Sequence, residues 1–238
     1  MMKNDIINVK NINKSFSNYS LFEGFSLSIK ENSIHAIIGP NGSGKTSLLR
    51  ILTGLYHVDS GDVEARSDHA MLLENDYLYE EKSGIENLKI FGLYFGYKTE
   101  NYEKYAKILN LKEHLEKRVS TYSKGMKRKL SLLIVILMDR GIIYLDEVTS
   151  GVDPISRVEI RKIINQLKLN GKTIVITSHD LSEVEKIADY ISMIENGKLI
   201  LNLTREEIKD KSLEDIFIEA GAKNEEFKQS NNLLYIKE

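Results

Sequence analysis

Residues 39–46 read Gly-Pro-Asn-Gly-Ser-Gly-Lys-Thr, a complete phosphate-binding loop. An apolar stretch at 34–38 precedes the loop and a helix-like stretch at 47–52 follows it, which is the strand–loop–helix setting that the motif needs. Glycines let backbone N–H groups close around phosphate oxygens, and the helix N-terminus adds partial positive charge. Lys45 would bring a charge to the β- and γ-phosphates, and Thr46 would offer a hydroxyl to Mg²⁺. We therefore expect a nucleotide to contact Gly39, Pro40, Asn41, Gly42, Ser43, Gly44, Lys45, Thr46 and Ser47.

Two carboxylates follow the apolar stretch at 142–145, which reads as a buried strand. In a fold with a phosphate-binding loop, a carboxylate at such a strand end holds Mg²⁺ through its water shell, so we expect Asp146 to be a metal ligand with Thr46. Glu147 can face the γ-phosphate and orient the attacking water as general base. The alternative is an ordinary strand end with solvated acids, which the phosphate-binding loop makes less favoured.

A histidine, His179, follows a third strand-like stretch at 173–177. The carboxyl ends of parallel strands open onto the ligand crevice, so this side chain is expected to reach the γ-phosphate as a catalytic residue, with Lys45 and Glu147. A lone surface histidine is the alternative. We expect surface positions for the other four histidines, His35, His57, His69 and His114.

A parallel sheet would bring these residues together. Strand-like stretches at 142–145, 173–177 and 190–194 alternate with helix-like stretches, which predicts parallel strands with right-handed crossovers. The other expected elements are short strands within 6–38, a strand at 69–73, and helices at 44–55, 83–96, 100–110, 125–138, 155–169 and 181–188. The helical block at 83–138 therefore reads as an insertion into an α/β nucleotide-binding core.

The composition excludes several other classes of protein. The 238 residues carry 33 basic and 35 acidic side chains, a net charge of −2, which gives no general attraction for nucleic acid. The absence of cysteine excludes disulfides and thiol catalysis and fits a reducing compartment. No signal peptide is evident at the start of the chain, and the longest apolar stretch, Leu130–Met138, is too short to span a bilayer. We expect a soluble, cytoplasmic chain that reaches a membrane only through a partner.

Residues 122–126, Tyr-Ser-Lys-Gly-Met, open the apolar helix expected at 125–138. Ser123 suits the N-cap, and Gly125 would let a phosphate approach the helix N-terminus closely. This signal is weak by itself, because many helices begin in this way. The basic run 127–129 predicts a solvated face.

Taken in order, the motifs of residues 5–202 resemble those of the ATP-binding cassette (ABC) ATPases. The matching segments are Gly39–Thr46 (Walker A), 122–126 (the signature usually written LSGGQ), Asp146 and Glu147 (the end of Walker B), Val148–Asp153 (the D-loop) and His179 (the H-loop). Phe16 fits the aromatic residue that stacks on adenine. The resemblance implies an α/β fold: a P-loop NTPase (RecA-like) core with an N-terminal antiparallel β subdomain and an inserted α-helical subdomain. It places the ABC ATPase domain at 1–202 and a small appendix at 203–238, in which Leu213, Ile216 and Phe217 would dock one helix.

The chain departs from the family pattern at Glu74, in the signature, and in the D-loop, where Val148 and Val152 replace the usual proline and leucine and keep an apolar character. Glu74 stands where the family has glutamine. A carboxylate only accepts hydrogen bonds, so Glu74 could accept from the water shell of Mg²⁺. We therefore expect Glu74 beside the ion and the nucleotide. In the signature, Lys124 replaces glycine and Met126 replaces glutamine, while Ser123 and Gly125, which would touch phosphate, are kept. No predicted catalytic group is lost, so an active ATPase is expected.

The resemblance also implies partners. Two cassettes would face head to tail, so that Ser123, Gly125 and the D-loop residue Asp153 meet the ATP of the other chain, in a homodimer or a heterodimer with a second cassette. The signature variant and Glu74 resemble cassettes that pair with ABC-2-type permeases, including exporters of peptides, drugs and antimicrobial compounds. We expect an ATP- and Mg²⁺-dependent subunit on the cytoplasmic face of the membrane, bound to an integral-membrane permease and not to nucleic acid. The alternatives are a soluble cassette that acts on a cytosolic complex, such as one for iron–sulfur cluster assembly, and a non-hydrolysing switch.

Overall fold

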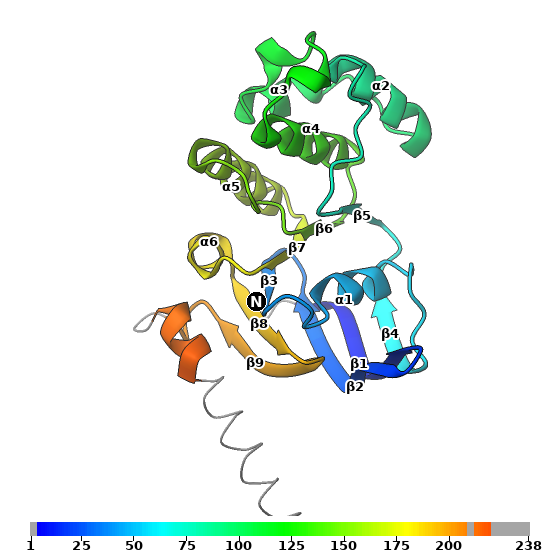
Figure 1. The fold of residues 1–238 in the computed structure, drawn as a ribbon, viewed down its shortest axis with the longest axis vertical. Coiled ribbons are helices and arrows are strands. Elements are labelled where there is room, and N and C mark those ends of the chain that lie inside the picture. The colour runs from blue at the N-terminus through cyan, green and yellow to red at the C-terminus, as the bar shows by residue number, and fades with distance from the viewer. Residues whose placement is uncertain (1–3, 209–211, 220–238) are drawn as a thin grey trace, which may run out of the picture.

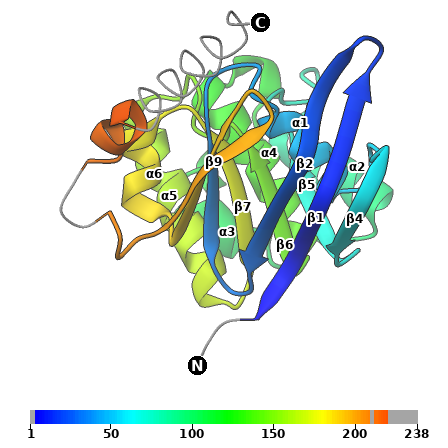
Figure 2. The same ribbon diagram turned by 90° about the horizontal axis from the view of Figure 1, so that it is seen from below.

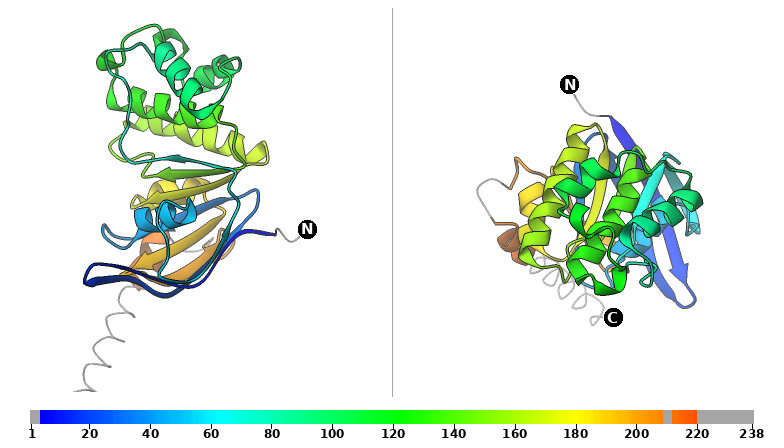
Figure 3. Two further views of the ribbon diagram at one scale, coloured as in Figure 1. Left: turned by 90° about the vertical axis from the view of Figure 1, so that its right-hand side faces the viewer. Right: turned by 90° about the horizontal axis from the view of Figure 1, so that it is seen from above.

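The computed structural model describes residues 4–208 and 212–219. Three helices, α2 (Gly84–Phe95), α3 (Tyr102–Ile108) and α4 (Lys124–Leu137), gather at one end of the molecule, and two sheets with further helices form the rest, as Figures 1 and 3 show. The further helices are α1 (Lys45–Leu52), α5 (Pro154–Leu169) and α6 (Leu181–Ile187), with short 3-10 turns at Lys112–His114 and Val119–Thr121. Within the described residues, no helix is long and apolar enough to cross a membrane.

The N-terminal sheet is antiparallel, with strand order β2-β1-β4, and lies along one side of the molecule in Figure 2. Its strands are β1 (Asp5–Phe16), β2 (Tyr19–Lys30) and β4 (Ser60–Ala65). The antiparallel subdomain is confirmed, but the expectation of short strands is wrong, because β1 and β2 each run for 12 residues. Irregularities in their pairing, near Asn11 (φ 50°) and Gly24 (φ 65°), let both strands bend and continue.

The central sheet has strand order β5-β6-β7-β3-β8-β9. Its strands are β3 (Ile34–Ile38), β5 (His69–Leu72), β6 (Ile142–Asp146), β7 (Thr173–Ser178), β8 (Tyr190–Glu195) and β9 (Lys198–Thr204). The first five in this order pair in parallel, as predicted, so β3, β6 and β7 deliver their carboxyl ends to one edge. The antiparallel β9 was not foreseen, although the Asn196-Gly197 turn before it, with φ of 48° and 71°, is typical of a two-residue hairpin.

The helical block is built around α4. Every residue of α4 from Arg128 to Leu137 is buried, and its apolar side chains share one core with the central sheet. The helix α2 begins with a capping box, in which Ser83 accepts from Glu86 N while the Glu86 carboxylate accepts from Ser83 N. A helix over 213–219 places Leu213 in the same core, with Phe217 packed against it; the remainder of the expected appendix at 209–211 and 220–238 lies outside the described residues.

Candidate nucleotide site

The phosphate-binding loop can be built only with glycine at two of its positions. At Gly39, where φ is 153°, an added Cβ would lie 2.0 Å from the carbonyl oxygen of Ile194. Gly44, with φ of 107°, precedes α1 and has no side chain to cap the helix. The first N–H groups of α1 are therefore left to point toward a ligand, which is the arrangement that binds phosphate.

Lys45, at the start of α1, is buried beneath this loop. Its Nζ donates to the carbonyl oxygens of Gly39 at 2.8 Å and Pro40 at 3.1 Å, and lies 3.9 Å from Glu147 Oε1. Burial lowers the pKa of the ammonium, and the carboxylate of Glu147 is the largest effect opposing that shift. The ammonium is thus held by acceptors of the loop at the place where phosphate oxygens are expected.

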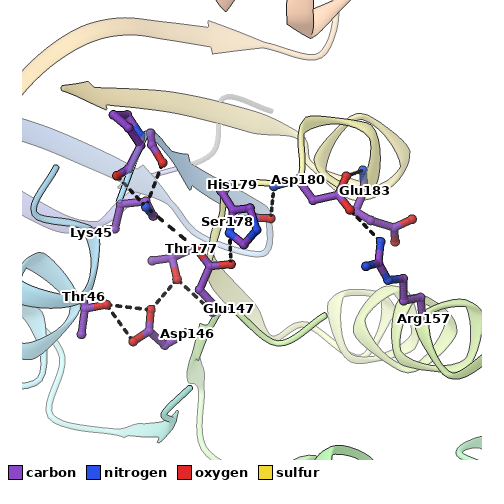
Figure 4. Close-up of polar contacts among 12 residues, drawn as sticks. Lys45, Thr46, Asp146, Glu147, Arg157, Thr177, Ser178, His179, Asp180 and Glu183 are labelled. Carbon is purple, nitrogen blue, oxygen red and sulfur yellow. Dashed lines mark hydrogen bonds and ion pairs between the residues drawn. The ribbon is translucent and has the colours of Figure 1, made fainter. Parts of the chain in front are cut away.

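Asp146 and Thr46 meet beside the loop (Figure 4). The hydroxyl of Thr46 donates to Asp146 Oδ2 at 2.9 Å, and the hydroxyl of Thr177 donates to Asp146 Oδ1 at 2.5 Å. The same Thr177 oxygen accepts from the backbone N–H of Glu147 at 3.0 Å. Thr177 was not identified from the sequence, where it is one more β-branched residue of a buried strand.

Glu147 is in a strained backbone conformation, with φ of 48°, in the left-handed region that a glutamate rarely adopts. Its Oε2 lies 2.9 Å from Nδ1 of His179, which follows β7 as predicted (Figure 4). The side chain of Glu147 is 11% exposed and that of His179 is 54% exposed. The left-handed turn therefore aims the carboxylate back over the loop instead of into solvent.

A cavity of about 390 Å³ opens above these groups. Its lining residues are Leu21, Asn41, Gly42, Gly44, Lys45, Thr46, Ser47, Glu74, Glu147, Ser150 and His179. The cavity thus unites residues expected from separate motifs. Leu21 was not foreseen because it belongs to none of them, and Ser150 lies in the D-loop segment 148–153 but was not singled out as a contact. We refer to this cavity as the nucleotide cavity.

Seven predicted contact residues do not line the nucleotide cavity: Gly39, Pro40 and Ser43 of the loop itself, and Phe16, Ser123, Gly125 and Asp153. Phe16 is 38% exposed and packs edge-on against Tyr56, with ring centroids 5.3 Å apart. Ser123 caps α4, as expected, by accepting from Met126 N, and Asp153 caps α5 by accepting from Ser156 N.

Gly125, which also lies outside the nucleotide cavity, is buried where α4 meets α5. A Cβ there would lie 2.6 Å from Asp153 Oδ2 and 2.7 Å from Ser156 Oγ, so packing within the chain already requires glycine. The Lys124 ammonium lies close to Gly151 of the D-loop, where a Cβ would meet it at 2.2 Å. The signature and the D-loop are therefore in contact with each other within one chain.

Two expectations of surface positions are wrong, one for the basic run 127–129 and one for His35. Residues 127–129 do not form a solvated face: Arg128 is 3% exposed and Lys129 is 5% exposed, and the latter pairs with Glu159 at 2.7 Å. The cause is that α4 packs against both β5 of the central sheet and α5, so the side of the helix that carries both cations has protein against it.

His35 is not on the surface either, because it lies on the central strand β3 and is 1% exposed. Its Nε2 is 2.7 Å from the hydroxyl of Ser192, which donates to Asn202 Oδ1 at 3.0 Å. Burial lowers the pKa of His35 to about 4, so the imidazole is neutral at pH 7. Of the other three, His57 is exposed, and His69 and His114 are half-buried.

A second, apolar hollow of about 190 Å³ lies between the core and the helical block. We call it the apolar groove; its lining includes Leu72, Leu73, Asn75, Tyr77, Phe91, Phe95 and Ile134. Tyr77 and Phe95 are 69% and 46% exposed, and Leu93 and Tyr94 of α2 are 87% and 73% exposed. Such a gathering of exposed apolar side chains is typical of an interaction surface.

A phosphate-binding loop between a parallel strand and a helix, with an acidic residue at the end of a neighbouring strand, defines the chain as a P-loop nucleoside triphosphatase. Residues 22–150 match the family described as "ABC transporter". The chain belongs to this family, as an ATP-binding subunit whose ATP hydrolysis is coupled to transport.

Relatives in bacteria agree with this assignment. The lantibiotic transport ATP-binding protein SrtF of Streptococcus pyogenes is 33% identical over 221 residues, which cover 89% of this chain and 96% of that protein. The Nod factor export ATP-binding protein I of Burkholderia lata is 32% identical, with 82% of this chain and 69% of that protein covered. The daunorubicin resistance ATP-binding protein DrrA3 of Streptomyces coeruleorubidus is 30% identical, with 87% and 71% covered.

Solved structures show the same fold. The ADP conformation of MJ1267, an ATP-binding cassette of an ABC transporter, superimposes with a TM-score of 0.78 at 25% identity, covering 90% of this chain and 99% of that one. An ATP-binding subunit of an ABC transporter gives a TM-score of 0.81 at 22% identity, covering 91% and 99%. The RecA-like core with its inserted helical subdomain is thereby confirmed.

Proposed function

We propose that this subunit powers an exporter by binding, on the cytoplasmic face of the cell membrane, to an integral-membrane permease of the ABC-2 type. The observation that carries the proposal is the apolar groove, which begins one residue from Glu74 of the nucleotide cavity. An apolar element of a permease would cover Tyr77 and Phe95 there. The names of three relatives, which refer to lantibiotic transport, Nod factor export and daunorubicin resistance, support an exporter of peptides or other small compounds.

Mg²⁺ would bind between the loop and β6. The hydroxyl of Thr46 and the carboxylate of Asp146 are hard oxygen donors 2.9 Å apart, and Mg²⁺ commonly takes only one or two such protein ligands beside water and phosphate. Glu74 lines the same cavity and can accept from the ion's water shell. When bound, the ion supplies positive charge to the β- and γ-phosphates.

Hydrolysis would use three side chains around the γ-phosphate. Glu147 orients the attacking water and takes its proton as the oxygen attacks phosphorus and the bond to ADP breaks. Lys45 donates to the phosphate oxygens in place of the carbonyls of Gly39 and Pro40. His179, 2.9 Å from Glu147, holds that carboxylate and faces the same phosphate. These roles place a proton acceptor and two donors on one cavity.

A second cassette would complete the site. Ser123 is exposed at the N-terminus of α4 and does not line the nucleotide cavity of its own chain, and the same holds for Asp153. In a head-to-tail pair, Ser123, Gly125 and Asp153 would face the ATP of the partner while Phe16 stacks on adenine. Light scattering of Glu147→Gln with Mg²⁺ and ATP tests this arrangement; a chain that stays monomeric at saturating ATP would contradict it.

The transporter role is tested by purifying tagged Glu147→Gln from native membranes in mild detergent with ATP and identifying the bound chains by mass spectrometry. We expect a polytopic membrane protein at a stoichiometric yield. Recovery of soluble partners alone, with nothing from the membrane fraction, would contradict the permease partner and leave the ATPase intact.

A further inference from the structure

One short segment, 73–76, separates the nucleotide cavity from the apolar groove. Glu74 lines the nucleotide cavity, whereas its neighbours Leu73 and Asn75 line the apolar groove. The chain bends at Glu74 and Asn75 after β5 ends, and this one segment presents side chains to both places. A displacement of this segment therefore changes both at once.

A buried cation holds this segment from behind. Nη1 of Arg128 donates to the carbonyl oxygens of Leu73 at 2.5 Å and Glu74 at 3.1 Å, and to Asp76 Oδ1 at 3.1 Å. Arg128 belongs to α4, in the helical block, and is 3% exposed. Every one of these acceptors lies in the segment that the two sites share.

The same guanidinium also holds the end of β6. Its Nη2 donates to the carbonyl oxygen of Asp146 at 2.5 Å, and its Nε donates to that of Val148 at 3.2 Å. These two carbonyls flank Glu147, the residue with the left-handed backbone. Arg128 thus touches the backbone on both sides of the expected general base without touching its carboxylate.

The geometry of arginine makes this link stiff. A guanidinium is planar and its five N–H donors have fixed directions, so its acceptors cannot shift independently without breaking hydrogen bonds. A buried ion pair is weak support for a purely stabilising role, because desolvation offsets much of the attraction. The next residue, Lys129, supplies the comparison: it is equally buried, on the same helix, but pairs with Glu159 of α5.

We propose that Arg128 is a positioning residue that links the apolar groove to the catalytic end of β6, by fixing segment 73–76 and the backbone around Glu147 to one guanidinium. The proposal rests on the proposed function, in which ATP binds the nucleotide cavity and a permease covers the apolar groove. A movement of segment 73–76 in the groove wall then shifts the backbone around Glu147 through the side chain of Arg128. Binding of nucleotide beside Glu147 shifts segment 73–76 through the same side chain.

Because the chain has no cysteine, Asn75→Cys gives one unique, exposed attachment point for a fluorophore in the groove wall. We expect Mg²⁺ and ATP to change the emission of this label. Arg128→Lys should reduce the change by about tenfold, because a lysine ammonium cannot donate the same set of hydrogen bonds as the planar guanidinium. A fluorescent ATP analogue should bind the Arg128→Lys variant with unchanged affinity. The matched control, Lys129→Gln, should keep the full emission change.

An emission change in Arg128→Lys equal to that in Lys129→Gln would overturn the proposal. So would a label at position 75 that does not respond to Mg²⁺ and ATP when Arg128 is present. Loss of nucleotide affinity in Arg128→Lys would also overturn it. This experiment contains no permease, so a wrong choice of membrane partner does not affect it. With a purified permease complex, we also expect Arg128→Lys to lower the stimulation of ATP hydrolysis by the permease about tenfold without changing KM for ATP. An unchanged stimulation would count against the link.

Discussion

The hydroxyl of Thr177 donates to Asp146 Oδ1 at 2.5 Å while it accepts from the backbone N–H of Glu147 at 3.0 Å. A single oxygen on β7 therefore fixes a carboxylate and the backbone of its neighbour at the end of β6. Each of these groups is buried or half-buried, so neither has water as an easy substitute. Asp146, the expected metal ligand, and Glu147, the expected general base, are thus both held in position by the hydroxyl of Thr177.

Removal of this hydroxyl should weaken both stability and turnover. In Thr177→Val the N–H of Glu147 loses its acceptor, which costs about 1–3 kcal/mol of unfolding free energy. We expect kcat for ATP hydrolysis to fall about tenfold or more through misplacement of Glu147, with little change in KM. Urea unfolding and phosphate release measure the two effects. Thr177→Ser keeps the hydroxyl and should restore most of both; a Thr177→Val enzyme with normal kcat would show that the hydroxyl is only structural.

The buried His35 should make stability depend on pH. An imidazole in the unfolded chain titrates near pH ~6.5, whereas the pKa of His35 in the folded chain is about 4. Between these values the unfolded chain binds more protons, so the free energy of unfolding falls as the pH falls. From pH ~7 to ~5 we expect this residue alone to remove about 2 kcal/mol.

His35→Gln provides the comparison, because an amide can still donate to Ser192 but does not titrate in this range. Urea unfolding of both proteins at the two pH values gives the difference. The wild type should lose more stability than His35→Gln on acidification; parallel losses would mean that His35 is protonated in the folded chain.

Two glycines of the phosphate-binding loop should respond differently to a methyl group. Gly39→Ala would place Cβ 2.0 Å from the carbonyl of Ile194, whereas a Cβ at Gly42 meets nothing within 4 Å. Both residues have positive φ, so each alanine adds strain, of order 1–2 kcal/mol for Gly42→Ala. We expect Gly39→Ala to lose binding of a fluorescent ATP analogue, with a lower Tm, and Gly42→Ala to keep weakened binding. Equal affinities would contradict the close approach at Gly39.

The apolar groove should be needed for the membrane partner and not for folding. Tyr77→Asp puts a charge on a 69% exposed groove residue, and Leu169→Asp, at the end of α5, puts one on a 78% exposed residue elsewhere. The loss of one apolar anchor costs about 2 kcal/mol of binding, or roughly thirtyfold in affinity. Quantitative co-purification with the permease should fall for Tyr77→Asp alone, with Tm unchanged in both variants. An equal recovery from both would place the permease on another surface.

Much of the fold was predictable because its signals are local. The loop at 39–46, the strand before Asp146 and the caps at Ser83 and Ser123 each depend on a few neighbouring residues. The strand β4, Ser-Gly-Asp-Val-Glu-Ala, has only Val63 as a large apolar residue. No alternation of apolar and polar residues therefore predicts this strand. It forms because β1 offers an unpaired edge, which is a property of the tertiary structure.

The nucleotide site, too, was predictable only where its signals are local in the sequence. Lys45, Glu147 and His179 were found from motifs, and the structure places all three on one cavity. Arg128 and Thr177 were not found as parts of the site, because a basic residue in a helix and a threonine in a strand have many possible surroundings. Only the packing of α4 and β7 against the end of β6 gives these two side chains their acceptors.

The proposed role of Glu147 as general base is what makes this chain an active ATPase. The measurement is steady-state phosphate release by the wild type and by Glu147→Gln, with binding of a fluorescent ATP analogue recorded for both. We expect linear release by the wild type, a fall of about 100-fold or more in Glu147→Gln, and similar nucleotide affinities. Release by Glu147→Gln at the wild-type rate would contradict the role of Glu147, and no release by the wild type even with its partner would identify a non-hydrolysing switch.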